Sequence, residues 1–379
     1  MPPAFPPRPA SYDRKVGLVL QGGGALGSYQ AGVYEILAGS DYQPDWIAGI
    51  SIGAINAAII AGNAPEHRVE RLRTFWEEIT SPTAGWPAAP EGPLAGAQRQ
   101  ASALASMAFG QPGFFTPRPP FEWLAGPGPA SWYDTAALKA TLERLVDFDR
   151  INARETRLSL GAVNVRTGNF AYFDNARIAI RPEHIMASGA LPPGFPAIEI
   201  DGEQYWDGGI VSNTPLQYMM ETAPRESRIV FQVDLFSARG PLPATLDAAE
   251  TRAKDIRYSS RTRAVTDSFR HLHNLGRNIQ LLWDHLPEEL RALPEAQFLH
   301  NAGHVARMDI VQLVYRPAED QGTGRGYEFG RPTLRARWQA GAEDATATLA
   351  AAPWLSPPGR LTGVRSFDVG FYRPPAQAG

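Results

Sequence analysis

A glycine-rich run near the start of the chain has residue types that could bind negative charge. Gly22, Gly23 and Gly24 open this run, and Gly27 closes it. Glycines let backbone N–H groups approach a ligand with no Cβ atom in the way, and N–H groups at the start of a helix face negative charge. The run therefore predicts an anion or oxyanion site, with a tight strand-to-helix turn as the structural alternative.

A serine flanked by glycines follows shortly afterwards. Ser51 stands two residues from Gly49 and two residues from Gly53. A sharp elbow between a strand and a helix needs small residues on both sides of a nucleophile, and it exposes the serine hydroxyl at the start of the helix. Ser51 is therefore a candidate nucleophile, although a serine at this position is also a common helix N-cap.

A third motif, much later in the chain, contains an acid. Asp207 precedes Gly208 and Gly209, and Asn213 and Pro215 follow. An aspartate before two glycines can form a simple turn, and that is the better interpretation of this motif when it is considered alone. Its chemical meaning depends on the two motifs that come before it.

The elements around the first two motifs predict how they are positioned. Residues 16–20 form a short apolar run that leads into the glycines, and residues 28–38 have helical spacing. Residues 46–50 predict a second strand that ends at Ser51, and the nearly all-apolar residues 52–62 predict a buried helix. Two consecutive strand–helix units favour parallel strands in an α/β sheet.

Further strands and helices are expected downstream. Strands are predicted at 157–165, 170–175, 228–235 and 308–315, and helices at 251–286 and 333–350. The helix at 251–286 carries one apolar stripe and an excess of basic residues. Such a helix can lie on an anionic membrane or pack on the domain with a solvated charged face, and we favour packing.

Residues 81–130 have a different composition, rich in alanine, glycine and proline. A long irregular stretch in a compact protein is usually a functional loop or a disordered insertion. The stretch also carries bulky aromatics, including the adjacent Phe114 and Phe115. We hypothesise that it forms a hydrophobic wall of a ligand pocket and moves to admit the ligand. The alternative is an ordinary surface insertion.

Taken together and in this order, QGGGALG, GISIG and DGG resemble the motifs of the patatin-like phospholipase family. The stretch ASGALPPGFPAIEIDGEQYWDGGIVSNTP also looks like the family's segment that leads into its catalytic aspartate. The resemblance covers roughly residues 16–235, and the later part is similar to the C-terminal extension of a bacterial subgroup. It implies an α/β protein with a three-layer α/β/α patatin-like fold, a mainly parallel central sheet and a largely helical C-terminal extension.

The resemblance also implies the chemistry of the three motifs. Ser51 would be the nucleophile and Asp207 the proton acceptor of a dyad without histidine, and the amides of Gly22 to Gly24 would form the oxyanion hole. The remaining motif positions are Gly27, Gly49, Gly53, Gly208 and Gly209. The implied activity is that of a serine lipid acyl hydrolase in lipid catabolism, with a lipid or acyl-ester substrate and no cofactor or metal.

The glycine run departs from the family at one position. Many family members carry Arg or Lys where this chain has Leu26. A cation at that position could favour an anionic head group. Ester hydrolysis is expected regardless of this difference, whereas the loop itself gives no support to a phospholipid head group.

Histidines allow a different interpretation, in which Ser51 belongs to a catalytic triad. Six of them follow it in the chain, and α/β-hydrolases use a serine, an acid and a histidine in that order. In those enzymes the nucleophile usually follows several strands, whereas Ser51 follows the second. The same histidines include two pairs with the spacing of metal ligands, although no third ligand is evident. The six are His184, His271, His273, His285, His300 and His304.

Two further classes of protein are weaker alternatives. The segment VGLVLQGGGALG fits the front of a dinucleotide-binding fingerprint, which needs an acid at the end of the second strand. Asp41 and Asp45 instead precede that strand, and Ser51 lies at its end. A non-catalytic lipid-binding or scaffold protein would not need the complete set of serine, aspartate and glycine motifs.

Composition limits the remaining classes of function. Of the 379 residues, 44% are hydrophobic and the net charge is −3, so a folded core is expected and a nucleic-acid partner is not. The absence of cysteine excludes disulfides, thiolate metal sites and a cysteine nucleophile. No apolar run is long enough to span a bilayer, and the Pro-rich start does not resemble a signal peptide. We therefore expect a cytoplasmic protein that contacts a membrane or lipid surface at its periphery.

These observations divide the chain into three expected parts. Residues 1–14 are a disordered lead, and residues 15–235 are a patatin-like catalytic domain with residues 81–130 as a loop-rich insertion. Residues 236–379 are a largely helical C-terminal extension.

Overall fold

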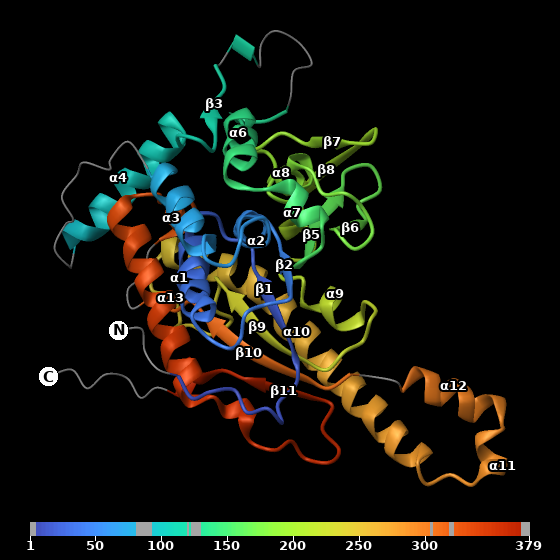
Figure 1. Cartoon of the computed structure of the whole chain (residues 1–379). Coiled ribbons are helices and arrows are strands. Elements are labelled where there is room, and N and C mark those ends of the chain that lie inside the picture. Colours follow the sequence, from blue (N-terminus) through green and yellow to red (C-terminus); the bar gives the residue numbers. More distant parts are fainter. Residues whose placement is uncertain are drawn as a thin grey trace, which may run out of the picture.

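A computed structural model describes residues 5–80, 93–119, 121–122, 130–303, 306–317 and 322–372 of the chain. Within these residues, one large sheet runs through the molecule and helices cover both of its faces (Figure 1). The strands along the sheet are β11, β10, β9, β1, β2, β5, β8 and β7 in spatial order, and β6 pairs with β5. This arrangement is the three-layer α/β/α organisation that the sequence predicted.

The first five elements agree closely with the sequence prediction. They are β1 (Lys15–Leu20), the 3-10 helix η1 (Gly24–Gly27), α1 (Ser28–Ala38), β2 (Trp46–Gly49) and α2 (Ile52–Ala61). β1 and β2 pair in parallel, as their strand–helix–strand connection requires. Since parallel strands present their carboxyl ends at the same edge of a sheet, the glycine run after β1 and Ser51 after β2 lie next to each other.

The remaining strands extend this sheet on both sides. They are β5 (Arg157–Asn164), β6 (Phe170–Asp174), β7 (Ile198–Ile200), β8 (Glu203–Asp207), β9 (Arg228–Asp234), β10 (Met308–Val314) and β11 (Val364–Phe367). The pairs from β11 to β5 along the sheet are parallel. β6 and β8 pair antiparallel with β5, and β7 pairs antiparallel with β8. The sheet is therefore mixed but mainly parallel.

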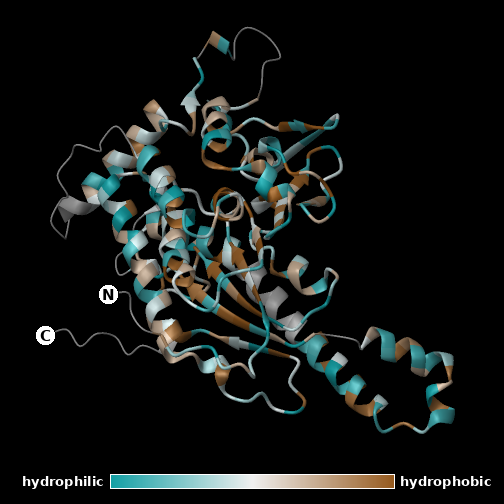
Figure 2. Cartoon of the chain, viewed as in Figure 1, coloured by the Kyte–Doolittle hydropathy of each residue, from teal (hydrophilic) through white to brown (hydrophobic). Residues whose placement is uncertain are grey.

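Helices on the two faces bury alternate residues of the strands. The helices around the sheet are α3 (Arg68–Glu78), α6 (Ala136–Leu145), α7 (Phe148–Asn152), α8 (Pro182–Ser188), α9 (Leu216–Glu221), α10 (Leu246–Trp283) and α13 (Arg331–Ala351), and α11 (Glu288–Arg291) and α12 (Pro294–Ala302) lie beyond the end of α10. On β1, Leu18 and Leu20 join the core beneath α1, α2 and α13, whereas Val19 packs with Met219 and Met220 of α9. Figure 2 shows the central strands as predominantly hydrophobic between these layers.

The C-terminal region is helical and also completes the sheet. β10 and β11 extend the sheet beyond β9, so they continue the hydrogen-bonding pattern begun by β1. α13 packs on α1 so closely that a Cβ atom on Gly32 would lie 1.9 Å from the Trp338 carbonyl oxygen. α10 packs against α9 and β11, in agreement with the packed rather than membrane-bound interpretation of this helix.

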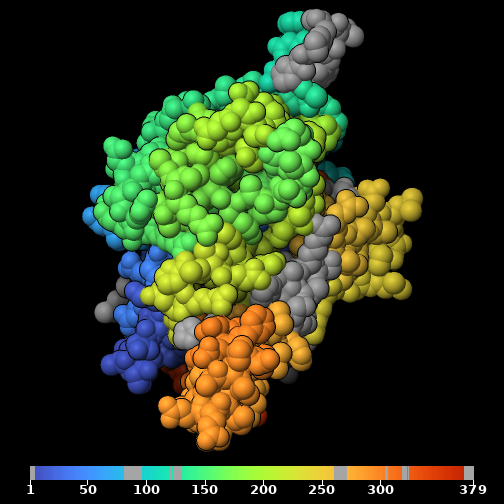
Figure 3. Space-filling model, turned by 90° about the vertical axis from the view of Figure 1, so that its right-hand side faces the viewer, coloured from blue at the N-terminus to red at the C-terminus, as the bar shows by residue number. Residues whose placement is uncertain are grey.

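The end of α10, with α11 and α12, extends away from the rest of the molecule (Figure 1). Viewed from that side, the segment forms a separate protrusion on the surface (Figure 3, orange). In the described part of the chain, no helix combines the length and apolar character that a membrane crossing would require.

The prediction that residues 81–130 are irregular is wrong for one part of that stretch. α4 (Pro93–Phe109) is a helix, and the short strands β3 (Thr116–Pro117) and β4 (Tyr133–Asp134) come after it. Residues 94–109 contain no proline and are rich in alanine, which has the highest helix propensity. Residues 81–92, 120 and 123–129 lie outside the described residues.

Candidate active site

Ser51 occupies a strained elbow between β2 and α2. Its backbone angles, φ 57° and ψ −125°, are rare for a residue with a side chain and are typical of strain at functional sites. A Cβ atom on Gly49 would lie 2.3 Å from the Gly53 carbonyl oxygen, and one on Gly53 would lie 2.3 Å from that of Leu20. Both flanking positions therefore require glycine, and the elbow predicted from the sequence is confirmed.

The elbow is held from the side by a second serine. The Ser51 amide donates to both the carbonyl oxygen and the Oγ atom of Ser188, each at 3.1 Å. The Ser188 hydroxyl in turn donates to the Gly161 carbonyl oxygen of β5 at 2.7 Å. Ser188 is the last residue of α8, so this helix fixes the backbone of Ser51 relative to the sheet.

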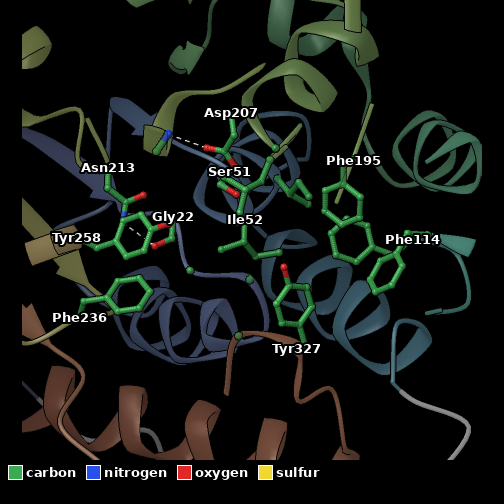
Figure 4. Close-up of a pocket in the computed structure, with 18 of the residues that line it drawn as sticks. Gly22, Ser51, Ile52, Phe114, Phe195, Asp207, Asn213, Phe236, Tyr258 and Tyr327 are labelled. Atoms are coloured by element: carbon green, nitrogen blue, oxygen red, sulfur yellow. Dashed lines mark hydrogen bonds between the residues drawn. The ribbon is translucent and has the colours of Figure 1, made fainter. Parts of the chain in front are cut away.

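Asp207, at the end of β8, lies directly beside Ser51 in the same pocket (Figure 4). Its side chain is buried, and Oδ1 accepts a hydrogen bond of 2.7 Å from the Gly209 amide. Burial raises the pKa of Asp207 to about 6, against the opposing effect of hydrogen bonds from the Ser51 hydroxyl and the Gly209 amide. The structure thus brings the predicted serine and acid together.

The turn after Asp207 leaves no room for larger residues. A Cβ atom on Gly208 would lie 2.6 Å from the Gly161 carbonyl oxygen. The Asp207 amide donates to the Ala190 carbonyl oxygen at 3.0 Å, so the backbone at this position is fixed from both sides. This close packing explains the DGG pattern, which the sequence alone could not distinguish from an ordinary turn.

The glycine run lies directly against the elbow. A Cβ atom on Gly22 would lie 3.0 Å from the Cβ atom of Ser51. The Gly22 amide donates to the Asn213 carbonyl oxygen at 3.3 Å, and Asn213 Nδ2 donates to the Gly22 carbonyl oxygen at 3.0 Å. The amides of Gly23 and Gly24 have no acceptor among the described residues. The Gly22 amide is therefore already engaged, and the oxyanion hole expected from the amides of Gly22 to Gly24 stays a prediction.

Gln21 positions this run, and no pattern in the sequence indicates this role. Its Nε2 atom donates to Thr214 Oγ1 at 3.0 Å, and its Oε1 atom accepts from the amides of Leu235 and Phe236 at 2.6 and 3.1 Å. A Cβ atom on Gly23 would lie 2.6 Å from Leu235 Cδ1. One buried amide side chain thereby joins the end of β1 to the end of β9.

A pocket that is partly open to solvent lies in front of these groups. Phe114 and Phe115 line it and are buried, whereas the binding of a ligand by this wall and its movement stay predictions. The Phe114 ring lies 5.9 Å from that of Phe195 and 6.0 Å from that of Phe329. Other residues that line the pocket are Ile52, Ile55, Leu191, Phe236, Lys254, Tyr258, Gly326 and Tyr327.

Four of these residues could not be recognised from the sequence as part of the pocket. They are Phe236, Lys254, Tyr258 and Tyr327. They come from the C-terminal part of the chain, and no motif marks them. Lys254 and Tyr258 are four residues apart on α10, so they share one helix face, but the sequence does not say which face meets the pocket.

The structure separates the histidines from Ser51. None of the described histidines lines the pocket. His184 is buried in α8, where its Nδ1 atom accepts from the Arg181 amide at 2.8 Å, and His300 stacks on Trp283 at 4.0 Å. His304 lies outside the described residues. Within the described chain, no cluster of three or more acids and histidines could hold a metal ion.

Comparisons with known proteins agree with this architecture. The family model described as patatin-like phospholipase matches residues 18–220, just over half of the chain, and a second model described as patatin phospholipase matches residues 256–360. No curated protein matches the chain.

Two solved structures are similar to the chain. VipD from Legionella pneumophila is 15% identical, the match covers 89% of this chain and 67% of that one, and the TM-score is 0.37. The ExoU–SpcU complex from the type III secretion system of Pseudomonas aeruginosa is 15% identical, with coverage of 78% and 66% and a TM-score of 0.26. The match therefore spans about two thirds of each of those chains.

The fold and the family match together define the class of protein. The chain belongs to the patatin-like phospholipase family and has the patatin fold. It is accordingly a hydrolase that acts on ester bonds of lipids. The family also removes the reason for reading the glycine run as part of a dinucleotide-binding oxidoreductase.

Proposed function

We propose that this protein is a serine lipid acyl hydrolase that works through a dyad of Ser51 and Asp207. The placement of the Ser51 hydroxyl beside the buried Asp207 carboxyl in one pocket is the observation that carries the proposal (Figure 4). A carboxylate with a pKa of about 6 is ionised at neutral pH and still basic enough to accept a proton in the transition state. The lack of any described histidine in the pocket favours this dyad over a triad.

The first half of the reaction acylates the serine. The Ser51 oxygen attacks the ester carbonyl carbon while Asp207 takes the hydroxyl proton. Negative charge then develops on the carbonyl oxygen, and the amides of Gly23 and Gly24 are the groups available to stabilise it. As the tetrahedral intermediate collapses, the protonated Asp207 delivers its proton to the departing alcohol.

The second half releases the acyl group. A water molecule attacks the acyl carbon on Ser51 while Asp207 accepts the water proton, and collapse returns that proton to the serine oxygen. The buried aromatic wall of Phe114, Phe115 and Phe195 would hold the acyl chain through both halves. Its apolar surface suits a hydrocarbon chain, which gains about 0.8 kcal/mol for each buried methylene group.

Labelling and substitution test the proposed nucleophile. A fluorophosphonate probe should label the wild-type protein at Ser51, and Ser51→Ala should abolish both labelling and ester hydrolysis while circular dichroism shows a retained fold. Ser356→Ala is the matched control, because it removes an exposed serine hydroxyl outside the pocket. Labelling of another residue, or full activity of Ser51→Ala, would refute the assignment.

We further propose that the protein meets its lipid substrate at a surface. Leu104 and Phe109 of α4 are 63% and 72% exposed, and α4 leads directly to Phe114 in the pocket wall. Replacing both exposed residues by serine should weaken sedimentation of the protein with lipid vesicles, whereas hydrolysis of a short water-soluble ester should be retained. Equal sedimentation of variant and wild type would contradict the proposed contact.

A further inference from the structure

One cation lies in the candidate active site, and the proposed reaction does not use it. Lys254 of α10 lines the pocket and is the only basic residue among the described residues that do so. A Cβ atom on Gly326 would lie 3.7 Å from Lys254 Nζ and 3.7 Å from the Gly23 carbonyl oxygen. The ammonium group therefore lies on the glycine-run side of the pocket, close to the reacting centre.

The Lys254 side chain is partly buried, and its ammonium group has no partner among the described residues. No hydrogen bond or ion pair joins Lys254 to any described residue. The nearest acid along the helix, Asp255, forms an ion pair with Arg325 instead. Burial and the nearby Arg325 charge lower the pKa of Lys254, while Asp255 raises it. An unpaired charge in a largely apolar pocket costs free energy, and a bound anion would remove that cost.

The pocket has two chemically different sides. Figure 4 shows Ser51 between Phe114 and Phe195 on one side and Tyr258 and Phe236 on the other. The aromatic side suits an acyl chain. An ester that places its acyl chain there directs its alcohol part toward α10, where Lys254 precedes Tyr258 by one helical turn.

Two hydroxyl groups on the α10 side of the pocket also suit an anionic group. The Tyr258 and Tyr327 hydroxyls have no hydrogen-bond partner among the described residues, and both side chains line the pocket. A phosphate has several acceptor oxygens, so it could accept from an ammonium group and from hydroxyl groups at once. A neutral alcohol offers fewer acceptors and no charge.

We propose that Lys254 is a specificity-determining residue that binds the phosphate group of a glycerophospholipid and selects it over a neutral glyceride. This assignment rests on the proposed function, because it presumes that the ester carbonyl lies at Ser51. The ammonium group donates hydrogen bonds to the phosphate on the alcohol side of the ester. It takes no part in bond making or breaking.

Matched soluble substrates test this role. Hydrolysis of dihexanoyl phosphatidylglycerol and of dihexanoylglycerol is measured below their micelle concentrations, and the ratio of their kcat/KM values is compared between proteins. Lys254→Met should lower this ratio at least tenfold, in line with the loss of a charge-assisted hydrogen bond. Lys254→Arg should keep most of it. Arg257→Met is the matched control, since it removes an exposed charge from the same helix and should leave the ratio unchanged.

A ratio in Lys254→Met within twofold of the wild-type ratio would overturn the proposal. Equal loss for both substrates would also overturn it, because Lys254 would then act on a step common to all esters. If Ser51 is not the nucleophile, the labelling experiment fails in the wild type, and that result is separate from the ratio.

A measurement on the wild-type protein avoids any dependence on folding of the variant. The ether analogues of the two lipids cannot be hydrolysed and should inhibit hydrolysis of p-nitrophenyl butyrate. The phosphatidylglycerol ether should inhibit with a Ki at least tenfold lower than that of the neutral ether. Equal inhibition by the two ethers would refute anion binding in the pocket.

Discussion

Gly22 and Asn213 are joined by two hydrogen bonds, one in each direction. The Gly22 amide donates to the Asn213 carbonyl oxygen, and the Asn213 side chain donates to the Gly22 carbonyl oxygen. Gly22 belongs to the run after β1, whereas Asn213 follows the turn that begins with Asp207. This pair therefore fixes the proposed oxyanion donors relative to the proposed base.

Loss of this connection should slow the chemical step. Asn213→Ala removes the side-chain bond and is expected to lower kcat roughly 10- to 100-fold with little change in KM, because small displacements of positioned groups are costly in the transition state. Fluorophosphonate labelling of Ser51 should slow but persist. Asn169→Ala, in the turn between β5 and β6, is the control. Unchanged kcat in Asn213→Ala would contradict the proposed positioning role.

The raised pKa of Asp207 predicts the pH dependence of hydrolysis. Only the ionised carboxylate can accept the serine proton, so kcat/KM should rise with pH through about 6 and level off above it. Below that pH, activity should fall about tenfold for each pH unit. A pH–rate profile with a soluble p-nitrophenyl ester measures this directly. A plateau that extends down to pH 4 would show that Asp207 is not the base.

The same carboxyl should limit the stability of the folded protein. The folded pKa of about 6 lies above the usual value of an unfolded aspartate, so the folded state binds the extra proton between about pH 4 and 6. The protonated carboxyl thus contributes to the stability of the folded state at low pH, and this contribution is lost as pH rises through 6. Asp207→Asn should be nearly inactive, yet about 3 kcal/mol more stable at most at pH 8.

Thermal melts at two pH values test this expectation. The stability difference between Asp207→Asn and wild type should be present at pH 8 and nearly absent at pH 4. Ser51→Ala serves as the control, since it removes activity without removing the buried charge. A variant that is less stable than wild type at pH 8 would contradict the expected cost of ionising Asp207.

The aromatic wall should determine the preference for acyl chain length. Replacing Phe114 and Phe115 by alanine removes apolar contact along the acyl pocket, so turnover of long-chain esters should fall more than turnover of short-chain esters. A series of p-nitrophenyl esters of graded length gives the comparison. Because both rings are buried, melting temperatures must be measured alongside. Equal loss at every chain length would leave only a structural role for these residues.

Part of this site could be predicted from the sequence because its residues lie within short motifs. The elbow at Ser51 and the turn at Asp207 need glycines wherever backbone atoms approach closely, and those requirements appear as local patterns. The elements around them alternate regularly between apolar strand and helix. Local patterns of this kind can be recognised in the sequence without knowledge of distant contacts.

Other parts could not be predicted because they depend on distant contacts or on averaged composition. Lys254 reaches the pocket only because α10 packs against α9 and β11, and no local pattern encodes that docking. The helix α4 was missed because proline residues on both sides dominate the composition of residues 81–130. The hydrogen bond that engages the Gly22 amide is made to Asn213, which lies far away in the sequence.

The packing of the C-terminal region has a consequence for biosynthesis. β10, α13 and β11 leave the ribosome after β9, yet β10 covers the free edge of β9 and α13 covers α1. A nascent chain that ends before β10 would expose an unpaired strand edge and an apolar helix face, both of which promote aggregation. The sheet can therefore be completed only after β11 has been synthesised, and a protein truncated after β9 is expected to require chaperones or to precipitate.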